Sequence, residues 1–194
     1  MPYHKYYLDH LYPLQDKFLA FFDKHNQNRF YLTGGTAFKQ ESLTIEIETI
    51  SDHFFRVYAK EKETSLKIDF VNEAVFHWGQ LNHFPIFPYV DNEMNILSNK
   101  ITCVSRYEVK DMADIWVLAK HLSFSWREVI DIANKKSPVD PVEVSKIIKT
   151  LPREELKIIK WALDVNIAEV YSDLQTIAED ILLGRTNTLK SRVK

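Results

Sequence analysis

Cysteine, long apolar runs and an excess of charge of one sign are all scarce in this sequence. Cys103 is the only cysteine among 194 residues, so one chain cannot form a disulfide framework or a zinc site built on cysteine ligands. No apolar run approaches the roughly 20 residues that cross a bilayer. The N-terminus, MPYHKYYLDH, has no signal-peptide core. We therefore expect a cytoplasmic protein with no membrane partner.

The net charge of −2 gives no overall basic field that would attract nucleic acid. Any contact with RNA must come from a local basic patch. The most basic stretch is the tail, with Arg185, Lys190, Arg192 and Lys194, and such tails are more often merely solvated. Hydrophobic residues make up 45% of the chain and charged residues 27%, which is typical of a folded globular protein.

The first half of the chain predicts one helix and four strands. Apolar residues recur at helical spacing over residues 6–25, where Pro13 should disturb the first half of the helix. The strands are predicted from a buried apolar run and from segments that alternate or are rich in aromatics. They are expected over residues 29–33, 43–48, 53–59 and 65–71.

The second half predicts only helices. A helix capped by Asn92 or Asn95 should run through ILSNKITCVSRY, and VKDMADIWVLAKHL should form the next. Four more are expected in SWREVIDIANKK, DPVEVSKIIKTL, PREELKIIKWAL and IAEVYSDLQTIAEDILLG, the last ending at Gly184. The fold class is therefore α+β, with an αβ domain over residues 1–92 and a helical domain over residues 93–194.

The segment LTGGTAF has the composition of a phosphate-binding turn between a strand and a helix. Gly34 and Gly35 would let the backbone approach a phosphate, and Thr36 would begin a helix whose N–H groups point at it. A tight turn without a ligand is the alternative.

Asp69 in SLKIDFV is an aspartate inside a predicted strand, a position that aspartate disfavours. Leu66, Ile68 and Phe70 should share one face of the strand, and Lys67 and Asp69 the other. Asp69 is thus either a metal ligand or a surface residue that pairs with Lys67.

Glu46 and Glu48 in TIEIET lie two residues apart, on one face of their predicted strand. Two such carboxylates and a third from a neighbouring strand can hold two Mg²⁺ ions about 4 Å apart for phosphoryl or nucleotidyl transfer. Ordinary polar surface is the alternative.

Five charged residues gather in NKITCVSRYEVKDMADIW. Those on the helix that begins near Val109 are three or four residues apart, beside an apolar face. The basic side chains among them could hold a triphosphate near a metal site, although an ordinary ion pair four residues apart explains Lys110 and Asp114 equally well. The five are Lys100, Arg106, Lys110, Asp111 and Asp114.

Taken together, YLTGGTAF, LKIDFV, NILSNKITCVSRYEVKDMADIW and the helical end resemble nucleotidyltransferases of the AbiEii/AbiGii toxin family, in chain order and over most of the sequence. These proteins look like DNA polymerase-beta-type nucleotidyltransferases. The resemblance implies a small mixed-sheet nucleotidyltransferase domain followed by a C-terminal helical bundle.

By this resemblance Gly34, Gly35 and Thr36 would bind the nucleotide phosphates. Asp69 would be the third metal ligand, and the five charged residues would form the helical motif that lines the cleft. Family members usually carry an S-[DE]-D-[ILV]-D-[LF] segment with the first two acids after the helix that follows the glycine turn, and none lies between Phe38 and Leu43 here. Glu46 and Glu48 would take its place, with longer side chains.

Two functions follow from the sequence. The first is a Mg²⁺-dependent nucleotidyltransferase of the abortive-infection, toxin-antitoxin type, which would transfer a nucleotide from an NTP to a hydroxyl of protein or of a tRNA-like RNA and could have a cognate antitoxin as partner. The second is a non-catalytic, degenerate protein that keeps this fold for binding. The missing acid-x-acid segment favours the second.

Overall fold

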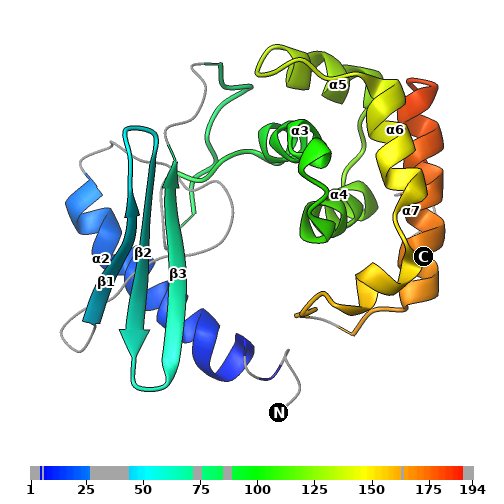
Figure 1. Cartoon of the computed structure of the whole chain (residues 1–194). Helices are drawn as coiled ribbons and strands as arrows, with labels where there is room; N and C mark the ends of the chain where they lie inside the picture. Colours follow the sequence, from blue (N-terminus) through cyan, green and yellow to red (C-terminus); the bar gives the residue numbers. More distant parts are fainter. Residues whose placement is uncertain are drawn as a thin grey trace. The chain divides into compact units, whose positions relative to one another are not determined.

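The structure is a computed structural model that describes residue 5 and residues 7–26, 44–71, 76–84, 89–162 and 164–189. The chain divides into two compact units (Figure 1). We call the first the sheet unit and the second the helical unit. The sheet unit comprises Met1–Val75 and Gly79–Asn92, and the helical unit comprises Phe76–Trp78 and Glu93–Lys194.

Three antiparallel strands form the described sheet, in the order β1-β2-β3. The fold class is therefore mixed α+β. The strand expected over residues 29–33, which a mixed sheet would need, lies outside the described residues. The other three expected strands are confirmed, with small shifts at their ends. They are β1 (Thr44–Ile50), β2 (Phe54–Glu61) and β3 (Thr64–Val71).

One face of this sheet packs against α2 (Tyr12–Asn26), which lies across the strands in Figure 1. The buried residues of β3 alternate with exposed ones and those of β2 with half-buried ones, because successive side chains point to opposite faces. The alternation expected over residues 65–71 is thereby confirmed. The buried residues are Leu14 and Phe18 of the helix, Val57 and Ala59 of β2, and Leu66 and Ile68 of β3. The opposite face carries the polar side chains.

The N-terminal helix has two parts, a π-helical turn η1 (Tyr7–Leu11) and the regular α2 that follows it. Pro13 is the second residue of α2. It has no N–H, so the hydrogen-bond ladder lacks one bond close to where the two parts meet. This agrees with the disturbance expected in the first half of the helix.

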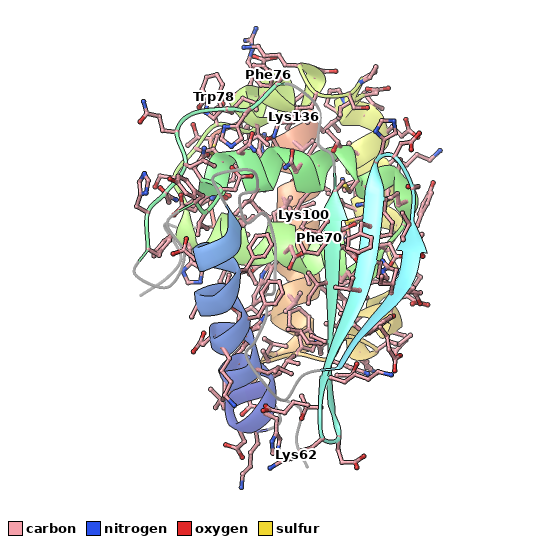
Figure 2. All side chains as sticks on the ribbon, turned by 90° about the vertical axis from the view of Figure 1, so that its left-hand side faces the viewer. Lys62, Phe70, Phe76, Trp78, Lys100 and Lys136 are labelled. Carbon is pink, nitrogen blue, oxygen red and sulfur yellow. The ribbon has the colours of Figure 1, made fainter. Side chains whose placement is uncertain are left out.

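A two-residue turn joins β2 to β3, because Glu61 pairs directly with Thr64. Its first residue, Lys62, has a positive φ of 54°, and Figure 2 shows this side chain at the tip of the hairpin. A side chain in this left-handed region costs roughly 1–2 kcal/mol relative to glycine. The turn is therefore a strained part of the sheet unit.

The helical unit contains five α-helices and two short 3₁₀ helices among its described residues. The predicted start of the helix in DPVEVSKIIKTL, with Asp140 before Pro141, and the predicted end of the last helix at Gly184 are confirmed. The Asp140 carboxylate accepts a hydrogen bond of 2.9 Å from the N–H of Val142, and Gly184 has a φ of 59° after the last helix. The elements are α3 (Glu93–Thr102), η2 (Val104–Arg106), α4 (Val109–His121), α5 (Trp126–Asn134), α6 (Pro141–Thr150), η3 (Arg153–Lys157) and α7 (Ile167–Leu182).

Two helical predictions were too long. The helix expected to run through Tyr107 ends at Thr102, and Tyr107 itself adopts a left-handed conformation with φ 58° and ψ 24°. Of the helix expected over residues 152–163, the described residues 152–162 form only η3, in which the N–H of Glu155 bonds to the carbonyl of Pro152, three residues back. No side chain caps its N-terminus. A tight 3₁₀ turn with poorer hydrogen bonds does not propagate into a long helix.

A single apolar core holds the helical unit together. Most of its members come from the helices α3 to α7, and Trp126 is fully buried in it. Within the part of the chain that the structure describes, no helix combines the length and apolar character needed to cross a membrane. Further fully buried residues of the core are Leu97, Ile115, Ile148, Leu174 and Ile177.

Candidate functional site

The sheet unit gathers three of the predicted acids on its polar face. Asp69 of β3 lies opposite Arg56 of β2, and Glu46 of β1 lies opposite Tyr58. The register of β1 shifts between Ile47 and Thr49, and Glu48 contacts both Arg56 and Tyr58 on the same face. The three carboxylates therefore share one surface, with Arg56 between Glu48 and Asp69.

Arg56 forms a two-point ion pair with Asp69. Its Nε lies 2.6 Å from Oδ1 of Asp69, and its Nη2 lies 2.9 Å from Oδ2. Nη1 of the same guanidinium lies 3.4 Å from a carboxylate oxygen of Glu48. The hydrogen bond to Asp69 raises the pKa of Arg56 further above its already high ordinary value. Arg56 therefore remains a permanent cation between two of the predicted metal ligands.

The other charges of this face are also matched. Lys60 Nζ lies 2.5 Å from a Glu46 carboxylate oxygen. Lys67 Nζ lies 3.8 Å from Oδ2 of Asp69. The ion pair of Lys67 and Asp69, which was the alternative to a metal ligand, is therefore present as a longer contact. Every acid of the polar face thus has a basic neighbour. Carboxylate oxygens suit Mg²⁺, but an ion bound at Asp69 would have to compete with Arg56.

The predicted phosphate turn of Gly34, Gly35 and Thr36 lies outside the described residues. Within the described ranges there is no group of three or more His, Cys, Asp or Glu residues close enough to hold a metal ion. A complete metal site would need a further ligand from the substrate or from a part of the chain that is not described.

In the helical unit, the structure brings together four of the five predicted charged residues. Lys100 Nζ lies 2.9 Å from Oδ1 of Asp111 and 2.6 Å from Oδ2 of Asp114, which joins α3 to α4. Arg106 of η2 approaches the same buried carboxylate, with Nη2 at 3.5 Å from Oδ2 of Asp111. The fifth residue, Lys110, is exposed and makes no ion pair with any described residue, so Asp114 pairs with Lys100 instead of its neighbour four residues back.

Burial and charge act in opposite directions on Lys100. Burial alone would lower its pKa, but the hydrogen bonds to Asp114 and Asp111 outweigh it and raise the pKa above the ordinary value. The ammonium group therefore stays charged beside Asp111, whose side chain is only 3% exposed. An ammonium has three N–H donors, so one remains for a further anion.

A second charged cluster in the helical unit was not identified from sequence. Lys120 of α4 lies 2.7 Å from a Glu169 carboxylate oxygen and 3.1 Å from Oδ2 of Asp173, both on α7. The indole N–H of Trp116 donates to the same oxygen of Asp173 at 2.9 Å. Sequence gives no signal for this cluster, because its two halves lie about 50 residues apart in the chain. Its position between two long helices indicates a structural role.

Arg56 was also missed from sequence. The signal was available in principle, since a basic residue on the polar face of a strand is the natural partner of an acid inside the next one. The register that aligns Arg56 with Asp69 follows from the short turn at Lys62.

Comparison of the chain with protein families, with curated proteins and with solved structures found no match.

Proposed function

We propose that the chain is a Mg²⁺-dependent nucleotidyltransferase of the abortive-infection type, which transfers a nucleotide from an NTP to a hydroxyl of RNA or protein. The observation that supports it best is the outward-facing Asp69 in the interior of a strand, on one surface with Glu46 and Glu48. Carboxylate oxygens are the ligands that Mg²⁺ prefers, and the substrate or another part of the chain would supply the remaining ligands. The metal would neutralise charge on the phosphates and activate the acceptor hydroxyl.

Arg56 has a definite place in this proposal. Its guanidinium holds Glu48 and Asp69 in fixed positions before substrate binds, through the contacts of 2.6 to 3.4 Å described above. Planar guanidinium groups also bind phosphate oxygens at two points. An NTP phosphate can therefore replace the two carboxylates as the partner of the Arg56 guanidinium, and the carboxylates are then available to bind metal. By the family resemblance, Lys100 and Arg106 of the helical unit would contact a triphosphate, and a cognate antitoxin would be the natural partner protein.

The experiment that tests this is labelling of RNA and protein. The purified chain is incubated with each α-labelled NTP, Mg²⁺ and total RNA, and label is followed in the RNA and in the protein. We expect incorporation with one or more NTPs and a loss of about 100-fold or more in Asp69→Asn, as removal of an electrostatic catalytic group produces. Asp16→Asn, at an exposed acid of α2, is the matched control and should label normally. Equal labelling by the wild type and Asp69→Asn would refute the role of Asp69.

A second function is favoured by one specific observation, the two-point ion pair of Arg56 and Asp69. Together with the pair of Lys60 and Glu46, it leaves the polar face nearly neutral, as a structural surface or a protein-binding surface would be. A non-catalytic binding protein of the same fold would then incorporate no label under any of these conditions. In that case Mn²⁺, used as a paramagnetic substitute for Mg²⁺, should not broaden the amide signals of β2 and β3 in NMR spectra.

A further inference from the structure

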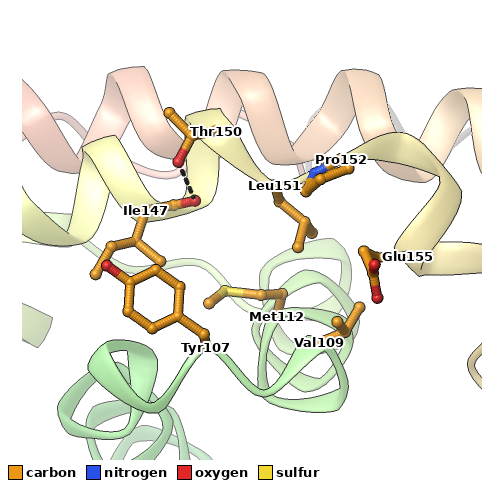
Figure 3. A pocket seen from close by; sticks show the side chains of 8 residues that line it. All are labelled: Tyr107, Val109, Met112, Ile147, Thr150, Leu151, Pro152 and Glu155. Atoms are coloured by element: carbon orange, nitrogen blue, oxygen red, sulfur yellow. Dashed lines mark hydrogen bonds between the residues drawn. The ribbon is translucent and has the colours of Figure 1, made fainter.

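The helical unit contains a pocket of about 380 Å³ between α4 and the segment that joins α6 to η3 (Figure 3). This volume lies within the range of roughly 300–1,000 Å³ that is usual for small-molecule sites. None of its lining residues belongs to the site predicted from sequence. Its walls are mostly apolar, and the side chains that form them are Val109, Met112, Ile147, Leu151 and Pro152.

Tyr107 stands at one end of this pocket, where Figure 3 shows its ring beside Ile147. Its backbone is left-handed, with φ 58°, and its side chain is 68% exposed. A bulky residue in this conformation is sterically strained, because its β-carbon lies too close to the following carbonyl oxygen. Such strain in a tyrosine that stays largely in solvent gains nothing for the core, and residues of this kind are concentrated at binding sites.

Glu155 lies at the other end, in the half-buried range of exposure. Within the described part of the chain, no basic side chain comes within ion-pair distance of its carboxylate. Its neighbour Glu154, by contrast, faces solvent and pairs with Lys157. A carboxylate beside apolar walls that has no cationic partner is costly to bury further, and a cationic ligand would compensate for it.

The third polar group of the pocket points to the same ligand chemistry. The Thr150 hydroxyl donates its proton to the helix, with the Lys146 carbonyl at 2.9 Å and the Ile147 carbonyl at 3.2 Å. It can therefore only accept a hydrogen bond from a ligand. Thr150 and Glu155 both require a donor, and neither suits an anion.

We propose that this pocket binds a small organic cation, a primary ammonium attached to an apolar chain or ring. The ammonium group binds the Glu155 carboxylate, and the apolar part lies along Met112 toward Tyr107. The tyrosine ring and the methionine sulfur both favour an aromatic or aliphatic group at that end. This site is separate from the nucleotidyltransferase proposal, and neither depends on the other.

The test uses three ligands of similar shape and different charge: 2-phenylethylammonium, 2-phenylethanol and 3-phenylpropanoate. Their binding to the full chain is measured by isothermal titration calorimetry and by ligand-detected NMR. We expect the ammonium compound to bind about tenfold more tightly than the alcohol, because a charge-assisted hydrogen bond is stronger than a neutral one, and tenfold corresponds to about 1.4 kcal/mol. The carboxylate compound should bind most weakly.

Variants then locate the site. Glu155→Gln should lower the affinity for 2-phenylethylammonium about tenfold, to the level of the alcohol. Glu154→Gln is the matched control, because it removes an adjacent acid outside the pocket, and should leave the affinity unchanged. Thr150→Trp, at an exposed wall position, should block binding of both compounds. Circular dichroism spectra identify any variant that fails to fold. If Thr150→Trp fails to fold, Glu155→Gln alone locates the site.

Three outcomes would overturn the proposal. The first is equal affinity for the ammonium compound and the alcohol, because the carboxylate would then have no role. The second is unchanged binding in Glu155→Gln or in a folded Thr150→Trp, because the ligand would then bind elsewhere. The third is no binding of 2-phenylethylammonium at millimolar concentration.

Discussion

Lys100 and Asp111 lie on different helices and are joined by a hydrogen bond of 2.9 Å between Nζ and Oδ1. The Asp111 side chain is 3% exposed, whereas that of Lys100 is 25% exposed. The aspartate is thus the buried partner, and the lysine reaches it from the rim of the core. This makes Lys100 the main compensation for a buried negative charge in the helical unit.

Replacement of Lys100 by methionine should therefore destabilise the helical unit. Methionine keeps most of the stem but leaves Asp111 with only the 3.5 Å contact to Arg106. Breaking a fully buried pair costs roughly 3–5 kcal/mol, and the partial exposure of Lys100 reduces our expectation to about 2 kcal/mol. Urea unfolding followed by tryptophan fluorescence measures it, because Trp78, Trp116, Trp126 and Trp161 all belong to the helical unit.

Lys110→Met is the control for this measurement. Lys110 is exposed on the same helix as Asp111, so its replacement should change the free energy of unfolding by less than about 0.5 kcal/mol. Equal stability of the two variants would show that Asp111 does not need the ammonium group.

The same ion pair predicts a loss of stability at alkaline pH. The pKa of Lys100 is raised above its ordinary value of 10.5 in the folded protein, so the folded state holds this proton more tightly than the unfolded state. The stabilisation is fully present below 10.5 and is lost as the pH rises through the folded pKa. Urea unfolding on both sides of pH 10.5 should show this decrease, and Lys100→Met should show less of it. An identical pH dependence in the two proteins would contradict the assignment to Lys100.

Sequence predicted the parts of the fold that depend on local pattern. The alternation over residues 65–71 identified the buried face of β3, and the cap at Asp140 identified the start of α6. The sequence did not predict where the backbone leaves helical geometry after α3. Nothing in VSRYEV marks the end of the helix at Thr102 or the left-handed conformation of Tyr107, which follows η2.

The candidate site could be predicted only in part, for a related reason. Periodicity identified Asp69 as outward-facing, but its partner Arg56 depends on the register between two strands. Likewise the contact of Lys100 with Asp111 depends on how α3 and α4 pack, and the sequence suggested the local pair of Lys110 and Asp114. Charges near in sequence are visible as a pattern, whereas charges brought together by packing are not.

The Lys120 cluster predicts unequal effects for its two acids. The hydrogen bond to Glu169 contributes most to raising the pKa of Lys120, burial opposes it, and Asp173 adds to it. The Glu169 side chain is nevertheless 55% exposed and the Asp173 side chain 8%, so water can replace the first contact but not the second. Asp173→Asn should cost about 1–3 kcal/mol in urea unfolding, because it also weakens the acceptor of the Trp116 N–H. Glu169→Gln, its matched partner, should cost less than about 1 kcal/mol.

Equal costs for the two variants would show that burial does not govern this cluster. Tryptophan fluorescence gives a second measurement, since of the two acids only Asp173 accepts a hydrogen bond from the indole N–H of Trp116, at 2.9 Å. We therefore expect a spectral change in the native state of Asp173→Asn and none in that of Glu169→Gln.

The turn at Lys62 predicts a stabilising substitution in the sheet unit. Lys62 has a φ of 54°, which glycine adopts without the steric cost of a β-carbon. Lys62→Gly should remove roughly 1–2 kcal/mol of strain from the folded state. It should also increase the entropy lost on folding, at a cost of up to about 1 kcal/mol, so we expect the free energy of unfolding to rise by about 0.5 kcal/mol. Glu63→Gly at the second turn position, which has no positive φ, gains no such relief and should destabilise. Amide hydrogen exchange in β2 and β3 distinguishes them, because slower exchange is expected only in Lys62→Gly, and faster exchange in that variant would refute the strain at Lys62.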